Sequence, residues 1–266
     1  YFGYDDTHPK LNGLRDLFTG LKTGDFYRLN SDGAVASCTL AKAKYAGIRG
    51  NALGVSVQSD PDNSGAFIVT TYMTTDNNRQ AVAKQSGVKT AADLVDNEYL
   101  KFEKSATLAA TAYTALTGGT NGAAVTTKNY QDGLEMLETY YFNDLGFPGS
   151  DDAIKGLLIN FTHRCRVQTG AKFQLVIHGK QGVNDEGVIS VLNDVTDSGA
   201  EKGSAVYWVT GQEASCAINE TVGNRKYTGE YTINTKYKQF ELEQAIKNGM
   251  FMFHSVTDSV GGNVTG

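Results

Sequence analysis

Residues that cross-link, stiffen or anchor a chain are rare in this sequence. Its 266 residues include 3 cysteines, 3 prolines, 4 histidines and 1 tryptophan. The cysteines, Cys38, Cys165 and Cys216, are odd in number and far apart, which is typical of free thiols from a reducing compartment rather than of a disulfide framework. Because glycine is abundant, at 30 residues, and proline is not, we expect turns with flexible corners.

Long apolar runs and an excess of positive charge are missing too. One of the longest uncharged stretches, residues 105–125, is threaded with threonine and glycine and is too polar to span a bilayer. Lysine and arginine number 24 against 29 acidic residues, and they are scattered along the chain. We therefore expect no membrane and no nucleic acid among the partners of this protein.

What is present is the composition of an ordinary globular protein. Hydrophobic residues make up 40% of the chain and charged residues 20%, with a net charge of −5. The length is sufficient for one large domain or two modest ones, each with its own core.

Helical spacing of apolar residues opens the chain. We expect Thr7 to cap a helix that has Pro9 in its first turn, and leucines recur on one face as far as Leu21. Two short strands, at 26–29 and 35–40, are expected to follow.

The spacing then changes to period two. Five short strands are predicted, separated by Asp, Asn and Gly turns, and only the segment 90–94 reads as a capped single turn of helix. These strands are 55–57, 67–73, 80–82, 99–102 and 108–116. Short strands with no long helix between them predict an antiparallel sandwich or a small barrel.

Helix and strand alternate in the remainder of the chain. A helix is predicted from Thr127, and Ser150 to Asp152 should cap another that ends before Gly170. Further strands are expected at 142–147, 173–177, 188–192 and 250–253, and further helices at 205–217 and 238–247. This alternation predicts a mainly parallel, helix-covered sheet.

The sequence thus predicts an α/β domain interrupted by an all-β domain. We expect residues 1–44 to form the first part of the α/β domain, residues 45–117 the inserted β-sandwich, and residues 118–266 the remainder of the α/β domain. The glycine-rich segments 47–54 and 118–122 would be the two crossings, and they should lie side by side.

No catalytic constellation can be assembled from these residues. The histidines are His8, His163, His178 and His254. Only His178 ends a predicted strand, and no Gly-x-Ser-x-Gly element exists to supply a nucleophile for it.

Phosphate and metal motifs also fail. The segment 118–122 lacks the lysine of a P-loop, and 47–54 misses the dinucleotide fingerprint in spacing. Residues 60–65 mimic the first half of a calcium loop, but Thr71 stands where the closing glutamate belongs, which favours a hairpin connection. We predict no catalytic, cofactor-binding or metal-binding residue and no cofactor.

Six segments together resemble a known family. They are FYRLN at 26–30, AKYAGIRGN at 43–51, GAKFQLVIHG at 170–179, GVISVLND at 187–194, AVYWVTG at 205–211 and YTGEYTINTKY at 227–237. In their joint order and spacing they resemble the tail sheath proteins of contractile phages and R-type bacteriocins, in the branch that includes diffocin-like particles.

The resemblance implies a fold and a function. It implies a subtilisin-like α/β sheath domain with an inserted β-sandwich, and a non-enzymatic structural subunit that forms stacked hexameric rings around a tail tube and contracts. Its expected partners are other sheath subunits, joined by terminal arms, with the tail tube, the baseplate and the tail terminator. We expect synthesis in a bacterial cytoplasm, and a chain that lacks the terminal arms and part of the C-terminal region.

Two alternatives from other classes stay open at this point. One is a subtilisin-like or esterase-like hydrolase with an inserted β domain. The other is a carbohydrate-binding module on a particle surface.

Overall fold

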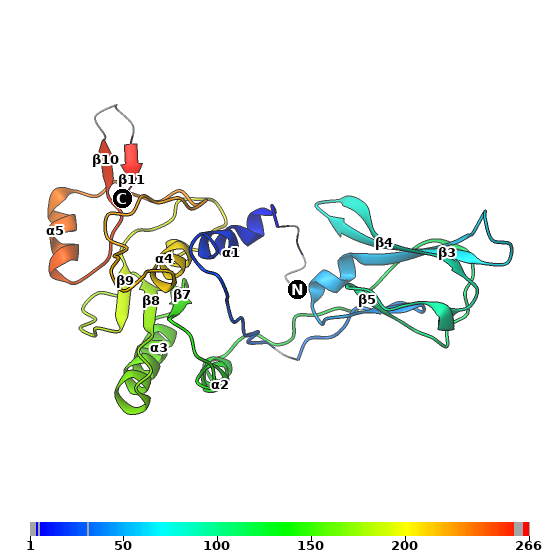
Figure 1. Ribbon diagram of the computed structural model, residues 1–266, viewed down its shortest axis with the longest axis horizontal. Coiled ribbons are helices and arrows are strands. Elements are labelled where there is room, and N and C mark those ends of the chain that lie inside the picture. The colour runs from blue at the N-terminus through cyan, green and yellow to red at the C-terminus, as the bar shows by residue number, and fades with distance from the viewer. Residues whose placement is uncertain (1–3, 5, 31, 258–262, 266) are drawn as a thin grey trace. The chain divides into compact units, whose positions relative to one another are not determined.

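The computed structural model describes residues 4, 6–30, 32–257 and 263–265, and these residues form two compact units (Figure 1). The β unit comprises residues 28–129. The α/β unit comprises the described residues of 4–27 and 130–265, so the β unit lies within it in sequence. A mixed architecture with separate sheets is thereby confirmed.

The β unit is built on antiparallel sheets. The main sheet has the order β4-β3-β2-β6, with β2 (Leu53–Ser59), β3 (Phe67–Thr75), β4 (Asn78–Val88) and β6 (Thr111–Ala115). A second pair joins β1 (Ala41–Ala43) to β5 (Leu100–Phe102).

Local sequence explains the connections of the main sheet. Asp76 and Asn77 have φ angles of 50° and 63°, which is the left-handed geometry of a two-residue hairpin loop between β3 and β4. The predicted single turn of helix is confirmed as η3 (Ala91–Asp93), where Thr90 and Asp93 form a capping box.

The core of the β unit corrects the expected domain boundary. Ala36, Leu40 and Ala43 are buried in the same cluster as Val55 and Leu100. The boundary expected at 44/45 is therefore wrong, because the segment that precedes it finds its apolar partners in the β unit. The strands expected at 26–29 and 35–40 are also absent from the assigned elements of the described chain, and Ser37 makes only isolated bridges.

The two glycine-rich segments do lie side by side. The side-chain amide of Asn51 donates to Gly119 O at 2.9 Å, and its Oδ1 accepts from Gly119 N at 2.8 Å. Ile48 N donates to the side chain of Asn121 at 3.0 Å. This pairing was predicted, but it lies inside the β unit rather than at its boundary.

The α/β unit contains the expected parallel sheet. Its order is β7-β8-β9, with β7 (Asp144–Phe147), β8 (Gln174–His178) and β9 (Val188–Val191). The closing strand expected at 250–253 is reduced to one parallel bridge between Val191 and Phe251.

The helix between β7 and β8 begins and ends as its sequence predicts. The Asp151 side chain accepts from the N–H groups of Ala153 and Ile154, so α3 (Asp152–Arg164) starts there. A π-helical turn, η4 (Cys165–Thr169), extends it to Gly170, whose φ of 76° ends the helix.

The first helix is shorter than predicted. It consists of the 3₁₀ turn η1 (Pro9–Leu11) and α1 (Asn12–Leu17), and His8 rather than Thr7 caps it because the turn begins one residue later. The remaining elements are α2 (Thr127–Leu137), α4 (Ala205–Ala214), α5 (Gln239–Lys247), β10 (Ser255–Thr257) and β11 (Asn263–Thr265).

Helices cover both faces of the parallel sheet. Alternate residues of β8 point to opposite faces, so Leu175 packs with Phe161 of α3 while Val176 packs with Val209 of α4. Among the described residues, no helix combines the length and apolar character needed to cross a membrane.

Candidate functional site

The four histidines are dispersed and serve local roles. His8 caps η1, and His163 on α3 is exposed, with Nδ1 2.9 Å from an Asp185 oxygen. His254 is exposed. Only His178, at the end of β8, is buried where parallel α/β sheets usually hold ligands.

His178 has an acidic neighbour. Its Nε2 lies 3.0 Å from Asp194 Oδ1, although the contact does not have the geometry of a hydrogen bond. Lys202 Nζ lies 3.1 Å from the other Asp194 oxygen. Burial lowers the pKa of His178, with Asp194 opposing, so the imidazole is neutral near pH 7. Asp194 is already paired with Lys202, so His178, Asp194 and Lys202 together form a local cluster of charges.

The cysteines and the calcium-like loop do not make a metal centre. Cys38, Cys165 and Cys216 are free thiols. The carboxylate of Asp60 accepts from the Asp62 and Gly87 N–H groups and from the Asn63 amide, which organises the hairpin between β2 and β3 as predicted. Nowhere in the described chain do His, Cys, Asp and Glu side chains gather as a metal ion requires.

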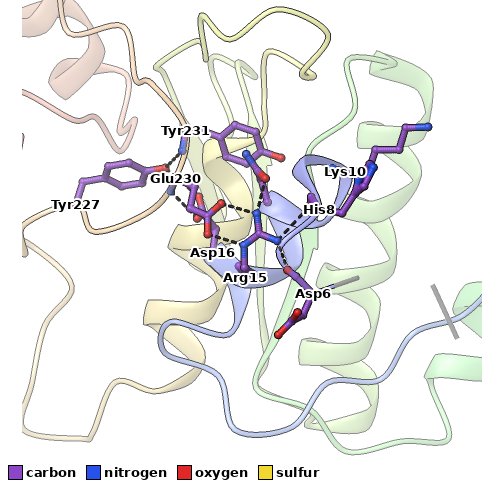
Figure 2. Close-up of polar contacts among 9 residues, drawn as sticks. Asp6, His8, Lys10, Arg15, Asp16, Tyr227, Glu230 and Tyr231 are labelled. Atoms are coloured by element: carbon purple, nitrogen blue, oxygen red, sulfur yellow. Dashed lines mark hydrogen bonds and ion pairs between the residues drawn. The ribbon is translucent and has the colours of Figure 1, made fainter. Parts of the chain in front are cut away.

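An extended polar arrangement joins α1 to the segment 227–231 (Figure 2). The Asp16 side chain is fully buried and accepts from the Tyr227 hydroxyl at 2.9 Å and from Glu230 N at 2.7 Å. Tyr231 N in turn donates to the Tyr227 oxygen at 3.1 Å. Burial raises the pKa of Asp16, and the two bonds that it accepts oppose this shift.

Arg15 forms the more exposed half of this arrangement. We call the contacts among Arg15, Asp16, Tyr227 and Glu230 the Asp16 joint. The Nε and Nη2 atoms of Arg15 contact the two carboxylate oxygens of Glu230 at 2.5 and 2.6 Å, a bidentate pair. Its Nη1 donates to the Asp6 and His8 carbonyl oxygens, so the guanidinium also holds the chain that enters α1 (Figure 2). The hydrogen bond to Arg15 lowers the pKa of Glu230.

Glycines allow α1 and α4 to approach closely. A Cβ on Gly211 would lie 2.1 Å from Leu17 O, and one on Gly20 would lie 2.4 Å from Gly211 O. A Cβ on Gly229 would lie 2.4 Å from Asp16 Oδ2. Gly211 of the segment AVYWVTG and Gly229 of the segment YTGEYTINTKY are thus required by the close contacts at this joint.

The joint connects parts of the α/β unit that are far apart in the sequence. It fixes the N-terminal helix on the α/β unit through a buried carboxylate, a bidentate ion pair and glycine contacts. Neither Arg15 nor Asp16 was expected from the sequence to be a functional residue. The one signal for them is the segment 227–237, which contains their partners.

Comparison with known families divides the chain close to the boundaries of the two units. Residues 31–121 match the phage tail sheath protein beta-sandwich domain, and residues 123–262 match the phage tail sheath protein central domain.

Two curated relatives come from Bacillus subtilis (strain 168). The uncharacterized protein YqbK is 29% identical over 280 residues, which cover 94% of this chain and 58% of the relative. The phage-like element PBSX protein XkdK is 29% identical over 274 residues, which cover 92% of this chain and 57% of the relative. The chain therefore spans little more than half the length of these relatives.

Two solved structures share the fold along the whole chain. A sheath tail protein from Desulfitobacterium hafniense has a TM-score of 0.84 and 29% identity, covering 99% of this chain and 63% of that one. A sheath tail protein from Listeria innocua has a TM-score of 0.78 and 32% identity, covering 99% of this chain and 60% of that one.

Proposed function

Because this chain belongs to the phage tail sheath protein family, we propose that it acts as a subunit of a contractile sheath, polymerising as stacked hexameric rings around a tail tube. Contraction of this sheath would drive the tube through a cell envelope. The observation that carries the proposal is the ordered match of both sheath domains to the two units, together with fold similarity over 99% of the chain.

We infer that the α/β unit moves as a rigid body during contraction. Subunits that rotate between two lattices must move as bodies, because the free energy released by the new contacts would otherwise be lost in internal deformation. The Asp16 joint and the close α1–α4 contact supply that rigidity within the unit. We also propose that this unit has a subtilisin-like fold. Its parallel sheet with helices on both faces supports this proposal.

The proposed partners follow from assembly with other sheath subunits, which the family implies. We propose that terminal arms of the full-length protein add strands to a neighbour's sheet, and that the tube, the baseplate and the tail terminator bind the assembled sheath. The curated relatives are long enough to carry such arms, since this chain covers 58% and 57% of them. Synthesis would occur in the bacterial cytoplasm, before assembly into a particle.

We propose no enzymatic role for this subunit. The hydrolase alternative finds no support in the comparisons, and in the described chain His178 Nε2 has no hydrogen-bond partner that could serve as a nucleophile.

Immunogold electron microscopy of contractile particles tests the function. An antibody against this chain should label the full length of the extended tail and only the shortened region after contraction. Label confined to the head, the fibres or free protein would contradict the proposal.

A further inference from the structure

A pocket of about 660 Å³ lies at the amino edge of the parallel sheet in the α/β unit. Asp144 and Gln174, the first residues of β7 and β8, form part of its wall. Glu213, in the last turn of α4, lies on the same wall together with Cys165 and Cys216. The joint and the histidines described above lie outside this pocket.

Three side chains of this pocket have acceptor oxygens without an ion-pair or hydrogen-bond partner. Within the described residues, neither Asp144 nor Glu213 forms an ion pair, and the buried Oε1 of Gln174 accepts no hydrogen bond. Burial, and then the charge of Glu213, raises the pKa of Asp144 to about 7. Burial also raises the pKa of Glu213, with Arg225 opposing. The pocket therefore holds acceptors that would gain from a cationic donor.

Neither Lys172 on the pocket wall nor Arg225 pairs with Asp144 or Glu213. Lys172 Nζ donates to Arg166 O at 3.0 Å, and Arg225 pairs with Glu220 at 2.9 Å. Glu138 on the pocket wall is neutralised by Arg164 through two hydrogen bonds, of 2.9 and 2.7 Å. Asp144 and Glu213 are thus the carboxylates of this wall that have no ion-pair partner among the described residues.

The backbone adds to this negative potential. In a parallel sheet with connecting helices, the helices run opposite to the strands, so their carbonyl ends lie at the amino edge of the sheet. Both α4 and the π-helical extension of α3 end beside the pocket, where Ala214 and Thr169 line it.

Aromatic side chains form another part of the wall. Phe173 stacks between Phe142 and Phe161, with ring centroids 4.6 and 5.8 Å away. At the rim, Tyr141 is 92% exposed and Ile218 fully exposed. Aromatic faces attract ammonium and guanidinium groups and pack against their methylene stems, whereas a hard divalent ion prefers six or more oxygen ligands.

We propose that this pocket receives an arginine or lysine side chain presented by a neighbouring copy of the subunit. Its charged end would pair with Asp144 and Glu213 and donate to Gln174 Oε1, while its stem would lie against the aromatic wall. The neighbour as the source rests on the proposed function, because a sheath subunit is surrounded by copies of itself. The exposed rim of Tyr141 and Ile218 would then be covered by the same neighbour.

Titration with small probes tests the pocket itself. N-acetylarginine methylamide and N-acetyllysine methylamide should shift the amide NMR signals of residues 142–145 and 213–216, and the neutral citrulline analogue should not. The double variant Asp144→Asn with Glu213→Gln should weaken binding at least tenfold, while Glu243→Gln, on the exposed face of α5, should leave it unchanged. Equal shifts from citrulline, or equal binding by the double variant, would overturn the cationic pocket.

The pH dependence adds a second readout. Binding should be tighter at pH 8 than at pH 6, because protonation of Asp144 removes one of the two negative charges. The other titratable or charged groups at the site are Glu213 on α4, Lys172 before β8, Glu138 with its partner Arg164, the Tyr140 and Tyr141 hydroxyls, and the thiols of Cys165 and Cys216. Arg225 acts on Glu213 from outside the wall. Loss of the pH dependence in Asp144→Asn is expected, and its persistence would assign it to another of these groups and refute the role of Asp144.

Photo-crosslinking in assembled particles tests the source. A benzoylphenylalanine at Tyr141 should crosslink to an arginine- or lysine-bearing peptide of another copy, identified as intermolecular by mixing isotope-labelled and unlabelled subunits. The same probe at Val95, an exposed residue of the β unit, is the control. Crosslinks within one chain or to a different protein would overturn the neighbour as the source. Absence of any ordered sheath would instead contradict the proposed function, and the titration would still decide the pocket.

Discussion

Replacement of Asp144 by asparagine should stabilise the isolated chain at alkaline pH. The side chain keeps its shape and loses its charge, and its pKa in the folded protein is raised from 3.8 to about 7. Since folding favours the protonated carboxyl, the contribution of this group to stability is fully present below about pH 4 and is lost as the pH rises to about 7. Above that pH the ionised carboxylate opposes folding.

The magnitude follows from the same shift. At about 1.4 kcal/mol for each pKa unit, the difference between 3.8 and about 7 corresponds to at most about 4 kcal/mol. Because water reaches the pocket and reduces the penalty, we expect Asp144→Asn to raise the free energy of unfolding by about 1–2 kcal/mol at pH 8 and by less than half as much at pH 5.

Urea unfolding followed by fluorescence measures this gain. The single tryptophan, Trp208, is buried in the α/β unit and reports on the unit that contains Asp144. Glu243→Gln on α5 is the matched control and should change stability by less than about 0.5 kcal/mol. A gain that is equal at pH 5 and pH 8, or a loss at pH 8, would refute the desolvation of Asp144.

Four further predictions follow from the joint and the two units. Asp16→Ala should lower the free energy of unfolding by about 2–4 kcal/mol, since two buried donors lose their acceptor. A decrease below about 1 kcal/mol would contradict this. By the same urea assay, Gly211→Ala should destabilise the chain, because Leu17 O leaves no room for a Cβ, whereas Gly156→Ala on α3, where a Cβ meets nothing within 4 Å, should be neutral or gain up to about 1 kcal/mol. Replacing residues 28–126 by a Gly/Ser linker should leave an α/β unit that unfolds cooperatively, and failure at every linker length would disprove independent folding. A fluorophosphonate should label no unique serine, and specific labelling would revive the hydrolase alternative.

Local signals in the sequence predicted the elements that depend on neighbouring residues. Asp151 caps α3, Thr90 and Asp93 form a capping box, and the loop at 60–65 connects a hairpin, all as their patterns indicate. Each of these features is decided by hydrogen bonds across a few residues, so the sequence alone carries the information.

Assignment of a segment to a core could not be predicted in this way. Ala36, Leu40 and Ala43 have an apolar spacing that either unit could bury, and only their contacts with Leu100 and Phe102 place them in the β unit. For α1 the leucine stripe was predicted from the sequence, but the burial of Asp16 was not.

The polar joint escaped prediction for a related reason. Asp16 and Tyr227 are 211 residues apart, and an aspartate on a short amphipathic helix normally faces solvent. Only the tertiary fold brings a tyrosine hydroxyl and a backbone N–H to that carboxylate. The same holds for Asp144 and Glu213, which share a pocket because a strand start and a helix end meet at one sheet edge.

Cryo-electron microscopy of the assembled particle, before and after contraction, tests the central claim most directly. We predict that the two-unit body of this chain repeats as stacked sixfold rings around the tube in the extended state. In the contracted state the α/β unit should keep its internal structure while its contacts with neighbours change. A sheath layer built from another protein, or a layer of this chain whose subunit contacts are identical in both states, would contradict the account.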